Sequence, residues 1–168
     1  MIYDSPIGSL DLAFDAGALT GLRIMDRQVS LNAQTMLKAP ADAFRWLDLY
    51  FAGCNPDFMP PLAPRGTGFQ QRVWRELLSI PYGATITYGE LARRVGCRSA
   101  QAVGHAVGRN PIAIIIPCHR VVAVGGLGGY AYGIDRKRRL LQWEAYPRGC
   151  TPLTGMASSG LSGHECLG

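Results

Sequence analysis

The sequence predicts an α/β protein in two parts, a small N-terminal part that mixes strands with helices and a mainly helical C-terminal part. Apolar residues alternate along residues 1–26, as in half-buried strands, and several later segments repeat them with helical spacing. Residues 55–64 hold four of the eleven prolines, a composition that favours extended backbone and stops helices. We therefore expect an N-terminal domain over 1–63, a second domain over 64–146 and a tail over 147–168.

The N-terminal part contains the expected strands. After the turn at Pro6-Ile7-Gly8, apolar residues alternate over 10–14 and again over 19–24, which predicts a β-hairpin or meander. Helical spacing follows over Val29–Leu37 and over Asp42–Phe51. This part is thus predicted to be a small α/β unit.

The C-terminal part opens with a helix whose ends are visible in the sequence. Thr67 precedes Phe69, Val73 and Leu77, which recur every four residues. The segment Ile80-Pro81-Tyr82-Gly83 is suited to end this helix.

Two short helices come next. Thr87 and Glu90 are spaced as a capping box, in which a hydroxyl and a carboxylate satisfy each other's free amides, and Gly96 is suited to end that helix. A further helix is expected from Ser99 to about Val107. The tight turn between the two helices has the length and the glycine of a helix-turn-helix connection, although such pairs also occur in proteins that do not bind DNA.

The chain then leads to a cysteine. Residues 100, 102, 104 and 106 of the helix expected from Ser99 are alanine or glycine. This helix therefore carries few large side chains and can approach another backbone closely. The β-branched run Ile112–Ile116 predicts a buried strand that leads into Pro117-Cys118-His119-Arg120. A glycine-rich loop over 125–129 and a helix over Asp135–Glu144 complete this part.

Composition argues against several classes of protein. No stretch of about 18 apolar residues predicts a membrane span, and the N-terminus lacks the pattern of a secretory signal. The five cysteines form an odd set without CxxC spacing, which favours reduced thiols and a cytoplasmic protein. The tail is rich in glycine and serine without periodicity, so we expect it to be poorly ordered.

Positive charge is concentrated in the second part. Residues 1–68 carry five basic and seven acidic side chains, whereas residues 69–148 carry twelve and four. A basic region that contains a helix-turn-helix connection favours contact with nucleic-acid phosphates. A solvated basic face without a partner is the alternative, and charge alone does not separate the two.

Cys118 is the main candidate for chemistry. His119 and Arg120 follow it directly, and an imidazole with nearby positive charge favours a reactive thiolate. The alternatives are an inert buried thiol, a core histidine bonded to a carbonyl and, for Glu144, an exposed helix residue. These residues gain a catalytic meaning only if the fold brings them together.

Together these motifs resemble the O6-alkylguanine-DNA alkyltransferases, also called methylated-DNA-protein-cysteine methyltransferases. The resemblance is strong over about residues 66–146 and loose over 1–63, where Ser5-Pro6-Ile7-Gly8 and Leu19-Thr20-Gly21-Leu22 carry it. The motifs of the strong part are Ile80-Pro81-Tyr82-Gly83, Thr87-Tyr88-Gly89, Ala102-Val103-Gly104, Asn110-Pro111, Ile116 to Val121, Gly125 to Tyr130, and Leu140-Leu141 with Glu144.

The resemblance implies a fold and a reaction. It implies a ribonuclease-H-like α/β N-terminal domain and a winged-helix-like C-terminal domain with a helix-turn-helix and an active-site cysteine. The protein would be a monomer that docks in the minor groove of double-stranded DNA and flips the alkylated nucleotide into its pocket. The alkyl group of O6-alkylguanine, and of O4-alkylthymine, would pass to the protein's own cysteine in a single turnover. No cofactor, metal or membrane is implied.

The resemblance also implies roles for individual residues. Cys118 would accept the alkyl group, activated through a water by His119, which Glu144 would orient. Tyr88 would donate a proton to the departing guanine, and Asn110 would hold the turn around the thiol. The residues implied to contact substrate or DNA are Gln101, Ala102, Gly104, Arg109, Arg120, Val121, Tyr130, Ala131, Tyr132 and Lys137.

The sequence departs from the family pattern at the expected DNA interface. Gln101 stands where the family usually has an arginine that fills the gap left by the flipped base, so we expect a less stable flipped state but intact chemistry. Tyr132 stands where many relatives have glycine, and Ala131 where some have serine, which predicts a narrower pocket that disfavours benzyl adducts. The structural zinc of some relatives is not expected, because only Cys54 precedes Cys97 and no histidine precedes His105.

Two other functions fit parts of the sequence. Alkyltransferase-like proteins bind the same lesions without chemistry, but they carry tryptophan where this chain has Cys118. A cysteine hydrolase or redox protein could use the same cysteine and histidine, and the basic helix-turn-helix would then be incidental.

Overall fold

A computed structural model of the 168-residue chain describes residues 1–26 and 40–146. Its N-terminal part is a three-stranded antiparallel sheet in which β2 is central, and Leu10, Leu12 and Leu22 point from β2 and β3 into the core. The predicted hairpin or meander is therefore confirmed. The strands are β1 (Ile2–Ser5), β2 (Gly8–Asp15) and β3 (Ala18–Ile24).

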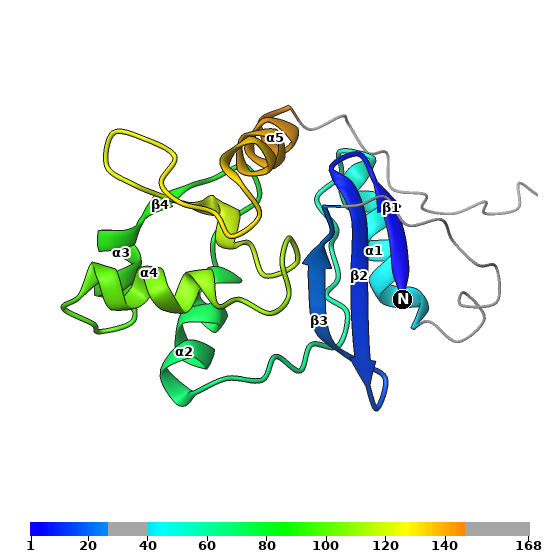
Figure 1. Ribbon diagram of the computed structural model, residues 1–168, viewed down its shortest axis with the longest axis horizontal. Coiled ribbons are helices and arrows are strands. Elements are labelled where there is room, and N and C mark those ends of the chain that lie inside the picture. The colour runs from blue at the N-terminus through cyan, green and yellow to red at the C-terminus, as the bar shows by residue number, and fades with distance from the viewer. Residues whose placement is uncertain (27–39, 147–168) are drawn as a thin grey trace, which may run out of the picture.

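Helix α1 (Ala41–Phe51) packs beside this sheet (Figure 1). Tyr3 of β1 stacks edge-on against Phe44, and its hydroxyl donates to Asp48 at 2.9 Å. The predicted helix over Asp42–Phe51 is confirmed, whereas the one predicted over Val29–Leu37 lies outside the described residues.

The proline-rich segment over residues 55–64 is extended and passes along the sheet. Leu19 donates from its amide to the Pro61 carbonyl, and its own carbonyl accepts from the Ala63 amide, both at 2.8 Å. The segment thus continues the N-terminal part toward the helices. A domain boundary at residue 63 stays a prediction.

Three helices follow where the sequence predicts them. The first is closed by a full capping box, because the Thr67 hydroxyl accepts from the Gln70 amide while the Gln70 side chain accepts from the Thr67 amide. The box predicted at Thr87 is only half formed: its hydroxyl accepts from the Glu90 amide, but the Glu90 carboxylate accepts from Arg94 at 2.6 Å. The helices are α2 (Gly68–Leu77), α3 (Tyr88–Arg94) and α4 (Ala100–Gly108).

The helix-turn-helix geometry is set at two points. Gly96 has a φ of +67°, a left-handed conformation that suits glycine at the end of α3. The Trp74 indole donates to the Ala106 carbonyl at 2.9 Å, which joins α2 to α4 in the interior.

Residues Ile112–Ile116 form a buried turn, so the strand predicted there is wrong. Ile114 has a φ of +70°, which costs a β-branched residue about 1–3 kcal/mol. Asn110 spans the turn, because its Nδ2 donates to the Ile116 carbonyl at 2.8 Å and its Oδ1 accepts from the Ile112 amide at 3.0 Å. These buried hydrogen bonds hold a conformation that the local sequence disfavours.

The same turn is attached to the sheet. The Leu22 amide of β3 donates to the Pro111 carbonyl at 2.8 Å, and the Ala113 amide donates to the Leu22 carbonyl at 3.0 Å. The chain continues into a single 3₁₀ turn, η2 (Cys118–Arg120), and then into β5 (Val121–Val122). Strand β5 pairs in parallel with β4 (Ile86–Thr87).

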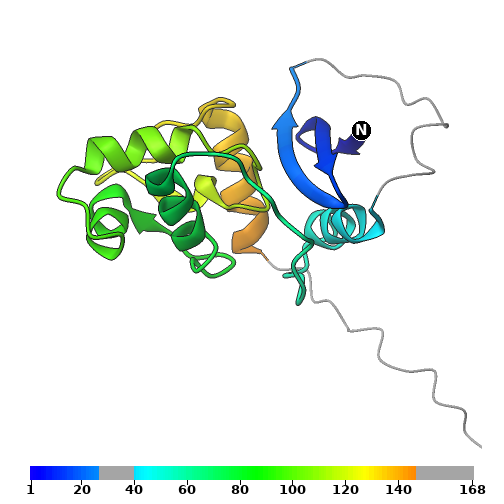
Figure 2. The ribbon, with the colours of Figure 1, turned by 90° about the horizontal axis from the view of Figure 1, so that it is seen from below.

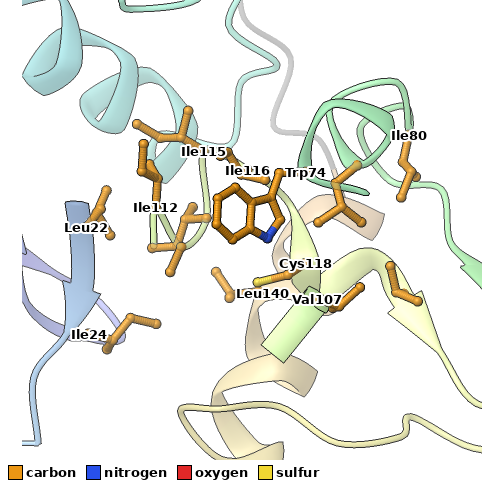
Figure 3. Packing of buried hydrophobic residues seen from close by; sticks show 14 of the residues in the cluster. Leu22, Ile24, Trp74, Ile80, Val107, Ile112, Ile115, Ile116, Cys118 and Leu140 are labelled. Carbon is orange, nitrogen blue, oxygen red and sulfur yellow. The ribbon is translucent and has the colours of Figure 1, made fainter. Parts of the chain in front are cut away.

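Helix α5 (Ile134–Ala145) lies between the sheet and helices α2–α4 (Figures 1 and 2), and it confirms the helix predicted over Asp135–Glu144. The buried apolar side chains of both parts form one cluster, so no solvent layer separates sheet from helices. Figure 3 shows Trp74 in this cluster, with Ile116 and Cys118 close by.

Cys97 and Cys118 are free thiols, whereas Cys54 is disulfide-bonded, so the expectation of reduced cysteines is wrong at Cys54. Within the described ranges, no helix has the length and apolar character needed to cross a bilayer. The tail over residues 147–168 lies outside the described residues.

We expect Asn110→Ala to lower the free energy of unfolding by about 1–3 kcal/mol, because it leaves the buried Ile112 amide without its partner and removes one of the two hydrogen bonds that the Ile116 carbonyl accepts. Urea unfolding measures this loss. Asn55→Ala, at an exposed position of the linker, is the control and should stay within about 0.5 kcal/mol of the parent. Equal stability of the two variants would contradict the role assigned to the Asn110 amide.

Candidate active site

A pocket of about 340 Å³ opens beside α4 and has Cys118 in its wall. Helix α4 forms one side, the loop over residues 129–132 another, and Tyr88 of α3 lies between them. The pocket contains seven residues that the sequence singled out: Tyr88, Gly104, Asn110, Cys118, Tyr130, Ala131 and Tyr132.

The Cys118 thiol is held in its protonated form. Its side chain is nearly buried, and this burial raises the pKa of the thiol. The Asn110 side chain, the charge of Lys137 and the Tyr130 hydroxyl act in the opposite direction without cancelling it. The resting cysteine therefore needs a base before it can act as a nucleophile.

His119, the next residue in the chain, is the candidate for that base. Its ring is fully buried, and burial lowers its pKa against the raising effect of Glu144, so the imidazole is neutral at rest. Nε2 lies 2.6 Å from the Glu144 carboxylate. Nδ1 is buried and has no hydrogen-bond partner among the residues the structure describes.

The Glu144 carboxylate receives five hydrogen bonds in the interior. His119 Nε2, the Tyr50 hydroxyl and one guanidinium nitrogen of Arg120 bond to Oε1 at 2.6, 2.8 and 3.0 Å. A second Arg120 nitrogen and the Gly83 amide donate to Oε2 at 2.8 and 3.1 Å. Burial alone would raise the pKa of Glu144, but His119 and Arg120 bring it down to about 2.

This carboxylate fixes the tautomer of the histidine. An ionised carboxylate can only accept, so the proton of neutral His119 must sit on Nε2, and Nδ1 keeps its lone pair. His119 and Glu144 thus have the arrangement of a base and its orienting acid in a catalytic triad.

Two tyrosines supply donors within the pocket. The Tyr88 hydroxyl donates to the Gly129 carbonyl at 3.4 Å, and burial, followed by the nearby Cys118, raises its pKa. Burial and Cys118 also raise the pKa of Tyr130 well above its usual value. Both phenols therefore stay protonated at neutral pH and can donate hydrogen bonds to a bound group.

The outer surface of α4 carries the residues expected at the DNA interface. Gln101, Ala102 and Arg109 are exposed. Gly104 faces the Tyr88 ring, and a Cβ at this position would lie 3.7 Å from that ring. The absence of a side chain at Gly104 therefore leaves space in the pocket beside Tyr88. Gly104 lines the pocket, whereas Gln101 and Ala102 line a separate depression of about 500 Å³.

Arg120, Val121 and Lys137 are buried, and their predicted contact with substrate or DNA stays a prediction. The Arg120 guanidinium donates to the Glu144 carboxylate and, at 2.7 Å, to the Ile80 carbonyl. Val121 is fully buried in β5. The Lys137 ammonium donates to the carbonyls of Val121 at 2.6 Å and Gly129 at 3.0 Å, which secures the loop at the pocket.

Sequence reasoning missed Tyr50 and the backbone of Gly83 as partners of Glu144. Tyr50 is 94 residues away and looks like one more apolar member of an amphipathic helix, so nothing local marks it. Gly83 belongs to the motif Ile80-Pro81-Tyr82-Gly83, but the sequence does not show that its backbone amide donates to Glu144.

No cluster of three or more histidine, cysteine or acidic side chains suited to a metal ion occurs in residues 1–26 and 40–146. The polar groups at the site instead satisfy one another around Glu144.

Comparisons with known proteins agree with this geometry. A family profile described as "6-O-methylguanine DNA methyltransferase, DNA binding domain" matches residues 68–146. The methylated-DNA-protein-cysteine methyltransferase of Mycobacterium tuberculosis is 49% identical over 146 residues, which cover 84% of this chain and 88% of the relative. The protein of that name from Methanosarcina acetivorans is 44% identical over 149 residues, covering 85% and 96%.

Solved structures give the same result. The crystal structure of Mycobacterium tuberculosis OGT in complex with DNA has a TM-score of 0.76 at 48% identity, covering 86% of this chain and 91% of that one. The fold and site define a protein that places a cysteine, histidine and glutamate site beside a helix-turn-helix. The chain belongs to the family of methylated-DNA-protein-cysteine methyltransferases.

We expect Glu144 to make the protein sensitive to acid. Its folded pKa of about 2 lies below the ordinary 4.5, so its contribution is complete above pH 4.5 and is lost as the pH falls toward 2. The difference corresponds to about 3 kcal/mol.

Urea unfolding between pH 2 and 7 measures this contribution. Glu144→Gln should lose about 3–5 kcal/mol at neutral pH, because the buried Arg120 charge loses its counter-ion, and should show a flatter acid dependence. Glu76→Gln, on α2, is the control. An acid dependence unchanged by Glu144→Gln would show that another group carries it.

Proposed function

We propose that this protein repairs alkylated DNA by moving an alkyl group from O6 of guanine, or O4 of thymine, onto Sγ of Cys118. The observation that carries the proposal is the position of this thiol. It lies in a pocket bordered by the second helix of a helix-turn-helix, and the next residue, His119, is paired with Glu144. Family membership supplies the substrate class, and the geometry supplies the acceptor and its base.

In the proposed step, the Cys118 proton passes through a water to Nδ1 of His119. Sγ attacks the alkyl carbon, the new carbon–sulfur bond forms, and the bond from that carbon to O6 breaks with its electron pair on guanine. The Glu144 carboxylate stabilises the imidazolium that forms. A thioether offers no ready reversal, so each molecule acts once.

Guanine leaves more easily when its negative charge is neutralised. Tyr88 and the loop that carries Ala131 line the same pocket as Cys118, where a hydroxyl and a backbone amide can donate to the ring and to O6. Tyr88 gives a proton to the ring, and the proton taken from Cys118 restores the phenol. The net products are alkylated protein and neutral guanine.

DNA is proposed to dock along α4 from the minor groove, with the alkylated nucleotide flipped into the pocket. Thr67 and Ser99, the N-caps of α2 and α4, line one depression of about 500 Å³ together with Gln101. Two helix N-termini on one face suit contact with phosphates. We propose that the protein acts as a cytoplasmic monomer.

The direct test is mass spectrometry of the intact protein after incubation with a duplex that contains O6-methylguanine. We expect one methyl group per molecule, located on Cys118 by peptide mapping. Cys118→Ala should gain none, whereas Cys97→Ser, which removes the other free thiol in the described ranges, should be methylated like the parent. Methylation of another residue, or none at all, would overturn the proposal.

Gln101→Arg tests how the flipped state is held. An arginine adds a charged donor on the exposed surface of α4, so duplex affinity and the rate of transfer should rise roughly tenfold, as for one charged hydrogen bond of about 1.4 kcal/mol. Gln142→Arg adds the same charge at an exposed position of α5 and serves as the control. If Gln101→Arg changes neither quantity, Gln101 does not limit flipping.

A further inference from the structure

The Tyr50 hydroxyl connects the N-terminal part of the chain to the catalytic carboxylate. Tyr50 lies on α1, is fully buried, and donates to Oε1 of Glu144 at 2.8 Å across 94 residues of sequence. Its ring is fixed by stacking on Trp46 at 5.2 Å and by edge contact with Tyr82 at 5.9 Å. A tyrosine held on both sides in this way has little freedom to point elsewhere.

The oxygen that Tyr50 contacts is the one that orients the base. Oε1 of Glu144 also contacts His119 Nε2 at 2.6 Å, so the phenol and the imidazole donate to the same atom. A donor on a carboxylate oxygen draws off part of its negative charge. The strength with which Glu144 holds the histidine proton therefore depends on whether the Tyr50 hydroxyl is present.

We propose that Tyr50 is a positioning residue for alkyl transfer, through which helix α1 sets the basicity of His119 by way of Glu144. This inference rests on the function proposed above. Burial and the charge of Glu144 keep Tyr50 protonated, because both raise its pKa well above the usual value. The phenol is thus a permanent donor throughout the working pH range.

The expected direction of the change in the His119 pKa follows from the charges around His119 and Glu144. Without the hydroxyl, the carboxylate is more negative at Oε1 and stabilises the imidazolium more, so the pKa of His119 rises. The other groups that face Glu144, His119 and the thiol remain in place: Arg120 and Cys118 on η2, Tyr82 before β4, Tyr130 in the pocket loop and Lys137 on α5.

The test compares Tyr50→Phe with Tyr3→Phe. Both changes remove one hydroxyl that bonds to an acidic side chain, but Tyr3 bonds to Asp48 on the outside of α1, away from the site. Two quantities are measured: the rate of methyl transfer from an O6-methylguanine duplex at pH 5 to 9, and the titration of the His119 ring by NMR without DNA.

For Tyr50→Phe we expect the His119 titration and the acid limb of the rate profile to move to higher pH by about one unit, as for loss of one hydrogen bond to a charged group. Tyr3→Phe should leave both in place. A folded Tyr50→Phe protein with an unshifted His119 titration would overturn the inference, and so would one that does not fold, since the hydroxyl would then serve stability alone.

The NMR titration keeps this test separate from the proposed function. If no protein transfers a methyl group but His119 still shifts in Tyr50→Phe, the proposed reaction fails while the coupling stands. If transfer occurs and neither readout moves, the coupling fails while the reaction stands.

Discussion

The buried carboxylate of Glu144 is the interaction on which the rest of this structure depends. An ionised group in the interior costs several kcal/mol unless donors replace the lost water. Three segments supply these donors to the carboxylate on α5: α1 through Tyr50, the turn after α2 through Gly83, and η2 through His119 and Arg120. Each segment is held where its donor reaches Glu144, so the contacts that stabilise the buried ion also fix the position of His119, the neighbour of Cys118 in the chain.

The N-terminal part supports the site at two separate places. Tyr50 reaches the carboxylate behind His119, while the edge of β3 at Leu22 pairs with Pro111 and Ala113 in the turn that precedes Cys118. One contact acts on the base and the other on the backbone that carries the nucleophile. Because the two parts share one apolar cluster, a change in the N-terminal sheet can alter the site without touching the pocket.

Local patterns were sufficient to predict most elements but not the contacts between them. Periodicity and caps located α1 to α5, because these signals lie within a few residues of each other. The run Ile112–Ile116 was wrongly predicted as a strand, since its left-handed Ile114 is imposed by Asn110 and by pairing with β3. The resemblance names Arg120 and Lys137 for contact with substrate or DNA, but a sequence does not show the buried partners that both side chains have in the fold. The resemblance correctly paired His119 with Glu144, yet nothing local could reveal Tyr50.

Burial gives the site a neutral resting state, and this suits a protein that is consumed by its own reaction. The pKa of Cys118 is raised and that of His119 is lowered, both first of all by burial, so thiol and imidazole are uncharged together and do not form an ion pair. A standing thiolate would react with any small electrophile that entered the pocket, and each such event would use up one molecule. With a neutral pair, a thiolate forms only when an electrophilic carbon stays beside Sγ long enough for the proton to leave. Under the proposed docking, a nucleobase bound between α4 and the pocket loop would meet that condition. The Asn110 side chain and the Lys137 charge, which both favour the thiolate, would then stabilise the thiolate as it forms.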